Sequence, residues 1–194
     1  MTSPDSSRFP RLVSLACHDI RTPLATVYGF ARTLSKSELE APASRYVAMI
    51  EAAAEQVSAL VDELSLVARI QAGSYEPTLT EVDSRALVDE AVAGLDSDSV
   101  SVTGEGAPVR VDAEPARRAL EQLVRATRRH GGLERVDVAV RGPEIEIGPM
   151  TDYSRPVVLG HELRELQAAA AVAVIEALGG GLEAGERLIV RLPE

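Results

Sequence analysis

Apolar residues recur at alternating steps of four and three between residues 9 and 36 of the chain. They are Val13, Cys17, Ile20, Leu24, Val27, Ala31 and Leu34. A second set with the same stepping follows the polar segment at 35–44: Tyr46, Ile50, Ala53, Val57, Leu60, Leu64 and Val67. This spacing predicts two long helices, each with one apolar face made for another helix. We expect an antiparallel hairpin that pairs with a second copy into a dimeric four-helix bundle, because a lone hairpin leaves much apolar surface exposed.

A second domain is predicted over residues 73–194, where the repeats become short and mixed, leaving residues 1–72 to the helical hairpin. Alternating segments predict strands at 78–82, 100–104, 109–112, 136–140, 144–148 and 187–193. Helices are predicted at 84–95, 116–129 and 163–178, with Asp112 as a cap of the second and Gly179 to Gly181 ending the third. The predicted fold class is α+β, with the helices of the second domain on one side of a mixed sheet.

Composition narrows the classes of partner. The net charge is −10 and the isoelectric point is about 4.9, which argues against a general binder of nucleic acid or anionic membranes. No apolar run approaches the length of a membrane span, and one cysteine, Cys17, permits no intramolecular disulfide. We therefore expect a cytoplasmic protein that acts on a protein partner or a small molecule.

The segment from Ser14 to Leu24 carries the most informative chemistry. If Cys17 and Ile20 lie in the apolar face, His18 lies outside it, with Thr22 one turn along on the same face. Further along this face come Ala25 and Gly29, which leave room for a docking partner.

Three neighbours of His18 give the histidine a chemical context. Asp19 can accept a hydrogen bond from one ring nitrogen and make the other a better nucleophile. Thr22 can hold a water in line with a phosphoryl group on His18, and Pro23 is expected to kink the helix. A surface histidine on a helix is ordinarily no more than that, so the interpretation depends on the joint pattern.

The segment HDIRTPLATVYGFARTL resembles the H-box of the dimerisation and histidine-phosphotransfer domain of sensor histidine kinases. The match includes His18, Asp19, Arg21, Thr22 and Pro23, and also Leu24. The resemblance implies phosphorylation on His18, transfer to an aspartate of a response-regulator receiver domain, Asp19 as general base and Thr22 as the phosphatase residue.

The order of elements after Ala72 resembles the catalytic ATP-binding domain of the same kinases, in an α/β-sandwich fold. Ala126 stands where the family's Asn holds the nucleotide's Mg²⁺, and Glu146 and Gly148 fall on the Asp-x-Gly-x-Gly turn, which keeps one glycine of two. Ala168 lies in an alanine run where the family has a phosphate-cradling glycine loop. Because phosphoryl transfer from ATP depends on the metal, ATP and Mg²⁺ binding are predicted to be lost.

We therefore predict a histidine phosphotransferase derived from a kinase. As a homodimer without a cofactor or metal of its own, it would exchange a phosphoryl group between His18 and receiver domains, which bring their own Mg²⁺. A hybrid or sensor kinase is a further expected partner. Two alternatives stay open: a divergent but active histidine kinase, and a non-catalytic dimeric scaffold for response regulators.

Basic side chains gather on one predicted helix of this acidic protein: Arg117, Arg118, Arg125, Arg128, Arg129 and His130. A solvated face explains them, and a docking patch for an acidic receiver or a residual phosphate site is the alternative. We assign no role to His130 or His161.

Overall fold

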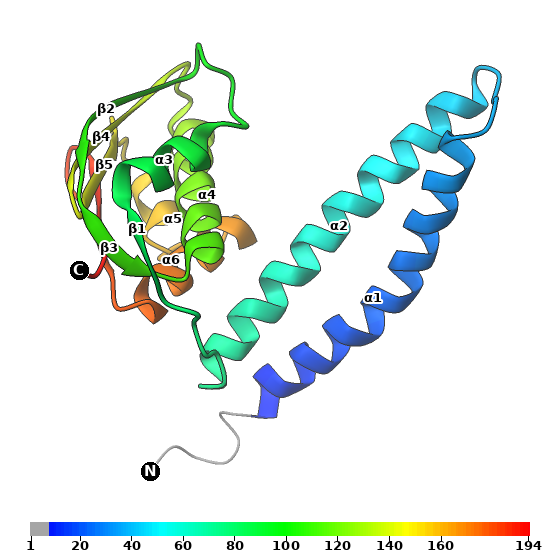
Figure 1. Cartoon of the computed structure of the whole chain (residues 1–194), viewed down its shortest axis with the longest axis horizontal. Helices are drawn as coiled ribbons and strands as arrows, with labels where there is room; N and C mark the ends of the chain where they lie inside the picture. Colours follow the sequence, from blue (N-terminus) through cyan, green and yellow to red (C-terminus); the bar gives the residue numbers. More distant parts are fainter. Residues whose placement is uncertain (1–7) are drawn as a thin grey trace. The chain divides into compact units, whose positions relative to one another are not determined.

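The computed structural model describes residues 8–194, and the chain divides into two compact units, Met1–Tyr75 and Glu76–Glu194. The first unit is a helical hairpin of α1 (Arg8–Ser35) and α2 (Ala43–Gln71). Figure 1 shows the two helices running antiparallel along their whole length. The predicted pair of long helices is confirmed.

Small and β-branched residues at seven-residue steps make the contact between α1 and α2. On α1 these are Cys17 and Ala31, with Leu24 half-buried between them. On α2 they are Val47, Ala54, Val61 and Ala68. The apolar residues predicted for the second helix lie beside this contact: Tyr46, Ile50, Val57, Leu60 and Leu64 are all exposed. The hairpin therefore uses one apolar stripe of each helix and leaves another uncovered.

The second unit combines a mixed sheet with helices. Its elements are β1 (Thr80–Asp83), α3 (Ser84–Val92), β2 (Val100–Gly106), β3 (Pro108–Val111), α4 (Ala113–Gly131), β4 (Val136–Gly142), β5 (Glu144–Gly148), α5 (Arg155–Val158), α6 (Leu166–Ala177), β6 (Gly181–Ala184) and β7 (Leu188–Arg191). Five strands form one sheet in the order β2-β4-β5-β7-β6, and β1 pairs with β3 in a small antiparallel sheet. Only β2 and β4 run parallel among the five.

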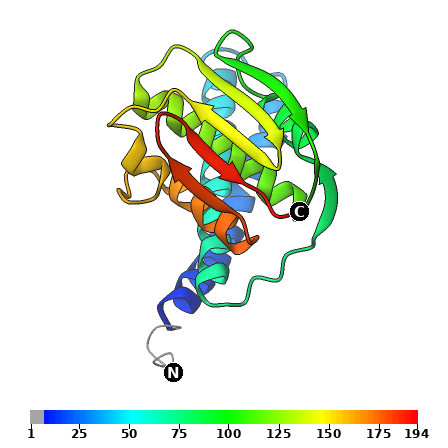
Figure 2. The ribbon, with the colours of Figure 1, turned by 90° about the vertical axis from the view of Figure 1, so that its left-hand side faces the viewer.

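The core of this unit lies between the five-stranded sheet and its helices, which cover one face (Figure 2). Alternate residues of the central strands, including Ile145, Ile147 and Leu188, are fully buried on that face. Leu123 of α4 and Ile175 of α6 meet them from the helical side and are equally buried. The predicted α+β class is confirmed.

Local chemistry explains where α3 and α4 begin and end. The Asp83 carboxylate caps α3 by accepting hydrogen bonds from the backbone N–H groups of Arg85 and Ala86, both at 2.9 Å. Gly132 ends α4 in the left-handed conformation, with φ of 61°. Asp112 is the N-cap residue of α4 as expected, but its carboxylate accepts from the N–H of Thr78 at 3.1 Å and makes no capping bond.

Two elements of the C-terminal half were not predicted. Residues 155–158 form the short helix α5, and Gly181, expected only to end a helix, opens strand β6. The alanine-rich helix α6 begins at Leu166 and not at 163, because Glu165 is extended, with φ of −143°.

Candidate phosphotransfer site

His18 lies on α1 with an exposed side chain, although its neighbour Cys17 is only 1% exposed in the contact with α2. The helix continues through Pro23 without a break, so the whole H-box segment belongs to one element. Asp19, Thr22, Ala25 and Gly29 are exposed as well. The imidazole is therefore open to a partner that approaches along this face.

Arg21 connects this face to the second helix. Its Nε and Nη2 donate to Oδ1 of Asp62 on α2, at 3.0 and 2.9 Å. Nothing in the sequence near Arg21 indicates Asp62 as its partner, because the two residues are 41 positions apart. A second hydrogen bond joins the two helices further along the hairpin, where the Tyr28 hydroxyl donates to Oε1 of Glu55 at 3.0 Å.

The side chains of His18 and Asp19 form no hydrogen bond or ion pair with any residue in the range 8–194. The expected bond between Asp19 and the imidazole is therefore not formed in this structure. The Thr26 hydroxyl donates to the Thr22 carbonyl, one turn back along α1, at 3.1 Å. Pro23 has no N–H group, so the Asp19 carbonyl four residues earlier receives no helical hydrogen bond from it.

An exposed apolar stripe runs along α1 beside this site. Ile20, Val27 and Leu34 follow one another at seven-residue steps and are 45%, 48% and 47% exposed. They continue the heptad pattern whose other half is buried against α2. Together with the exposed apolar residues of α2, this stripe is the surface that a second hairpin would cover.

In the second unit, the positions that resemble the kinase nucleotide site are filled by the protein core. Ala126 of α4 and Ala168 of α6 are both 0% exposed. Neither side chain carries an atom that could coordinate a metal ion. Within residues 8–194, no three His, Cys, Asp or Glu side chains come together in an arrangement suited to a metal ion.

Glu146 lies on the face of the sheet that the helices do not cover. Strand alternation places it opposite the buried Ile145 and Ile147. Its carboxylate forms ion pairs with Arg141 at 3.2 Å and Arg187 at 3.5 Å. The carboxylate therefore belongs to a charged outer surface and does not enter the space between sheet and helices.

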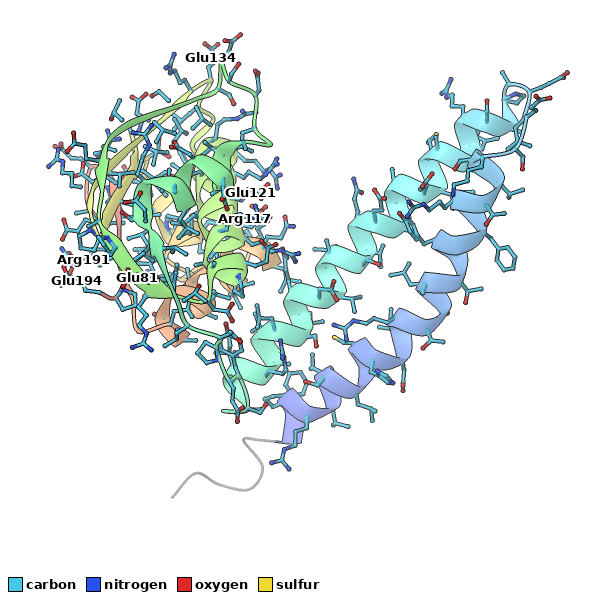
Figure 3. All side chains as sticks on the ribbon, viewed as in Figure 1. Glu81, Arg117, Glu121, Glu134, Arg191 and Glu194 are labelled. Carbon is cyan, nitrogen blue, oxygen red and sulfur yellow. The ribbon has the colours of Figure 1, made fainter. Side chains whose placement is uncertain are left out.

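Most of the arginines on α4 are neutralised by glutamates of the same helix. Arg117 forms ion pairs with Glu121 at 3.2 Å (Figure 3) and with Glu114 at 2.9 Å. Arg125 also pairs with Glu121, at 2.8 Å. The hydrogen bond from Arg117, helped by Arg118, lowers the pKa of Glu114 to about 2. The positive charges of Arg117, Arg118 and Arg125 are therefore balanced in part by glutamates of the same helix.

His130 contacts Glu165, a partner that could not be predicted from the sequence. Its Nε2 lies 2.8 Å from Oε2 of Glu165, and Arg129 Nη1 lies 2.7 Å from the other oxygen of the same carboxylate. The Glu165 side chain is only 11% exposed. This carboxylate therefore joins the end of α4 to the start of α6. The contact is an ion pair between two helices and gives His130 no catalytic role.

Comparisons with known proteins agree with this arrangement. Residues 11–73 match the His Kinase A (phospho-acceptor) domain family. The sensor histidine kinase TrcS of Mycobacterium tuberculosis is 33% identical over 123 residues, which cover 60% of this chain and 24% of that protein. The chain thus spans about a quarter of the length of this relative.

Two solved structures share the fold. Full-length ShkA in complex with AMPPNP gives a TM-score of 0.71 at 19% identity, over 95% of this chain and 46% of that one. The histidine kinase AdeS of Acinetobacter baumannii gives 0.59 at 17% identity, over 91% of this chain and 97% of that one. Residues 11–73 are therefore similar to a phospho-acceptor domain, and the chain shares its fold with these two structures. None of the helices within residues 8–194 is long and apolar enough to cross a membrane.

Proposed function

We propose that this chain is a dimeric histidine phosphotransferase that exchanges a phosphoryl group between His18 and the aspartates of receiver domains, without using ATP. The observation that carries the proposal is the exposed His18 in the phospho-acceptor segment, combined with the fully buried Ala126 and Ala168 in the second unit. His18 provides a nucleophile, and the two alanine side chains offer no ligand to the metal ion of a nucleotide.

In the forward step, a ring nitrogen of His18 attacks the phosphorus of an aspartyl phosphate. An N–P bond forms, the P–O bond breaks, and the carboxylate leaves on the receiver. Asp19 would orient the imidazole through a hydrogen bond to its other nitrogen once a partner has docked. Thr22, one turn along, would hold the water that hydrolyses the phosphorylated histidine. The receiver would supply the Mg²⁺ that neutralises charge on the phosphoryl oxygens.

The alternative of an ATP-driven kinase is favoured by the name of the curated relative, a sensor histidine kinase. Incubation of the purified protein with γ-labelled ATP and Mg²⁺, beside a His18→Gln variant, separates the two functions. We expect no acid-labile, alkali-stable label on either protein. Label on the parent that is absent from His18→Gln would establish the kinase and overturn the proposal.

A non-catalytic scaffold would depend on the dimer and not on the histidine. In the pathway that the chain serves, His18→Gln should therefore abolish function if phosphoryl exchange is the role. If His18→Gln kept full function while Leu24→Asp, in the helix contact, destroyed it, the scaffold would be the better account.

A further inference from the structure

The second unit contains a cavity of about 520 Å³ that includes neither Ala126 nor Ala168. It lies between the turn after α3, the start of β2 and the C-terminal half of α4. Its volume falls within the range of about 300–1,000 Å³ that small-molecule pockets occupy. Such a cavity is large enough for a ligand of one or two rings.

Three arginines on one face of α4 line this cavity. They are Arg125, and Arg128 and Arg129, which follow it by three and four residues. Arg125 is held by Glu121 at 2.8 Å, and Arg129 by Glu165 at 2.7 Å. The side chain of Arg128 has no hydrogen bond or ion pair with any residue that the structure describes. One arginine of the cavity is therefore available to a ligand.

The remainder of the lining is mostly aliphatic. Leu95, Val100, Val124 and Leu133 contribute apolar surface, and Val124 is only 2% exposed. The one acidic residue of the lining is Asp96, whose Oδ1 accepts from the N–H of Asp98 at 3.2 Å within its own turn. Arg125 and Arg129 are each paired with a glutamate outside the lining, so Arg128 is the arginine of this cavity that has no acidic partner among the described residues.

We propose that this cavity binds a small organic anion with an apolar body. The aliphatic side chains would cover the body, and Arg128 would pair with the anionic group. A guanidinium beside apolar surface favours such a ligand over inorganic phosphate, which offers nothing for the aliphatic side chains to cover. This site is independent of phosphoryl exchange at His18.

The test is a fluorescence titration of the full chain with anilinonaphthalene sulfonate, an anion with a flat apolar body. We expect saturable binding to the parent. Arg128→Gln should weaken it by about tenfold, the change expected from loss of one charge-assisted hydrogen bond. Gly94→Leu should also weaken binding by at least about fivefold, because the leucine would occupy part of the space that the apolar body of the probe fills. An added Cβ at Gly94 meets no atom within 4 Å, so the fold tolerates this change.

Two matched variants control for charge and for added side-chain volume. Arg118→Gln removes a positive charge from α4 outside the cavity, and Gly185→Leu adds the same side chain at an open glycine after β6. Both should bind the probe within about twofold of the parent, since surface charges outside a site contribute little. The proposal is overturned if the parent shows no saturable binding, if either cavity variant binds like the parent, or if the controls weaken binding equally.

Discussion

The guanidinium of Arg21 and the carboxylate of Asp62 join the two helices of the hairpin, three residues after the exposed His18 on α1. Both contacts of Arg21 converge on one oxygen, at 3.0 and 2.9 Å. Cys17, buried on the other side of His18, fixes the same stretch of helix against α2. The exposed imidazole therefore lies on a part of α1 that contacts α2 both before His18, through Cys17, and after it, through Arg21.

A double-mutant cycle on Arg21 and Asp62 measures what this ion pair contributes. The two side chains are 44% and 51% exposed, so solvent screens their attraction. We expect a coupling energy of about 0.5 kcal/mol in the free energy of unfolding by urea, from Arg21→Ala, Asp62→Ala and the double variant. A coupling above about 2 kcal/mol would contradict the assignment of an exposed, weakly stabilising pair.

The proposed dimer can be tested at the exposed stripe on α1. Val27, 48% exposed in the single chain, would be buried in a four-helix bundle. Val27→Asp would place an unpaired charge there, and we expect it to convert dimers to monomers in light scattering after gel filtration. Thr26→Asp, the adjacent exposed position, is the control and should remain dimeric. Equal behaviour of the two variants would rule out this stripe as the interface.

The carboxylate of Glu165 is expected to stabilise the second unit. Glu165→Gln replaces a nearly buried charge that faces both Arg129 and His130. We expect a loss of about 1–3 kcal/mol in the free energy of unfolding, measured with urea. Glu134→Gln, at an exposed position in the same unit, should change it by less than about 0.5 kcal/mol. Equal effects of the two substitutions would mean that the contact between α4 and α6 does not depend on this charge.

The lowered pKa of Glu114 predicts a pH dependence of stability with a definite sign. Its pKa falls from 4.5 to about 2 on folding, chiefly through the hydrogen bond from Arg117. The stabilisation is therefore complete above pH 4.5 and is lost as the pH falls toward 2. Because the side chain is 56% exposed, we expect only a fraction of a kcal/mol between the parent and Glu114→Gln at pH 6.

Urea unfolding of both proteins at pH 6 and pH 3 checks this expectation. The difference in unfolding free energy between the parent and Glu114→Gln should be smaller at pH 3. A difference that stays constant, or that grows as the pH falls, would contradict the role of Arg117 in holding this carboxylate ionised.

Periodic patterns predicted the long elements of this fold. The heptad steps identified α1 and α2, and alternation identified β4 and β5, because burial on one face repeats along a regular element. Patterns could not predict which of two apolar stripes on α2 would meet α1. Both stripes have seven-residue spacing, and the hairpin buries the one with small residues such as Ala54 and Ala68.

The side-chain partners of the candidate site could not be predicted from the sequence. His18 and its exposed face follow from position on a helix. Asp62, by contrast, pairs with Arg21 from 41 residues away, and Glu165 pairs with His130 from 35 residues away. Such pairs form only through tertiary packing, which local sequence patterns do not contain. The short helix α5 was missed because its four residues span about one helical turn, which is too short for the pattern to repeat.

Phosphoryl transfer from a receiver tests the central claim most directly. A panel of receiver domains, labelled on their aspartates by a small phosphate donor and freed of it, is mixed with the parent protein or with His18→Gln. We predict that acid-labile, alkali-stable label moves from at least one receiver to the parent and never to His18→Gln. Label that reaches both proteins equally, or that reaches neither from any receiver of the panel, would contradict phosphoryl exchange at His18.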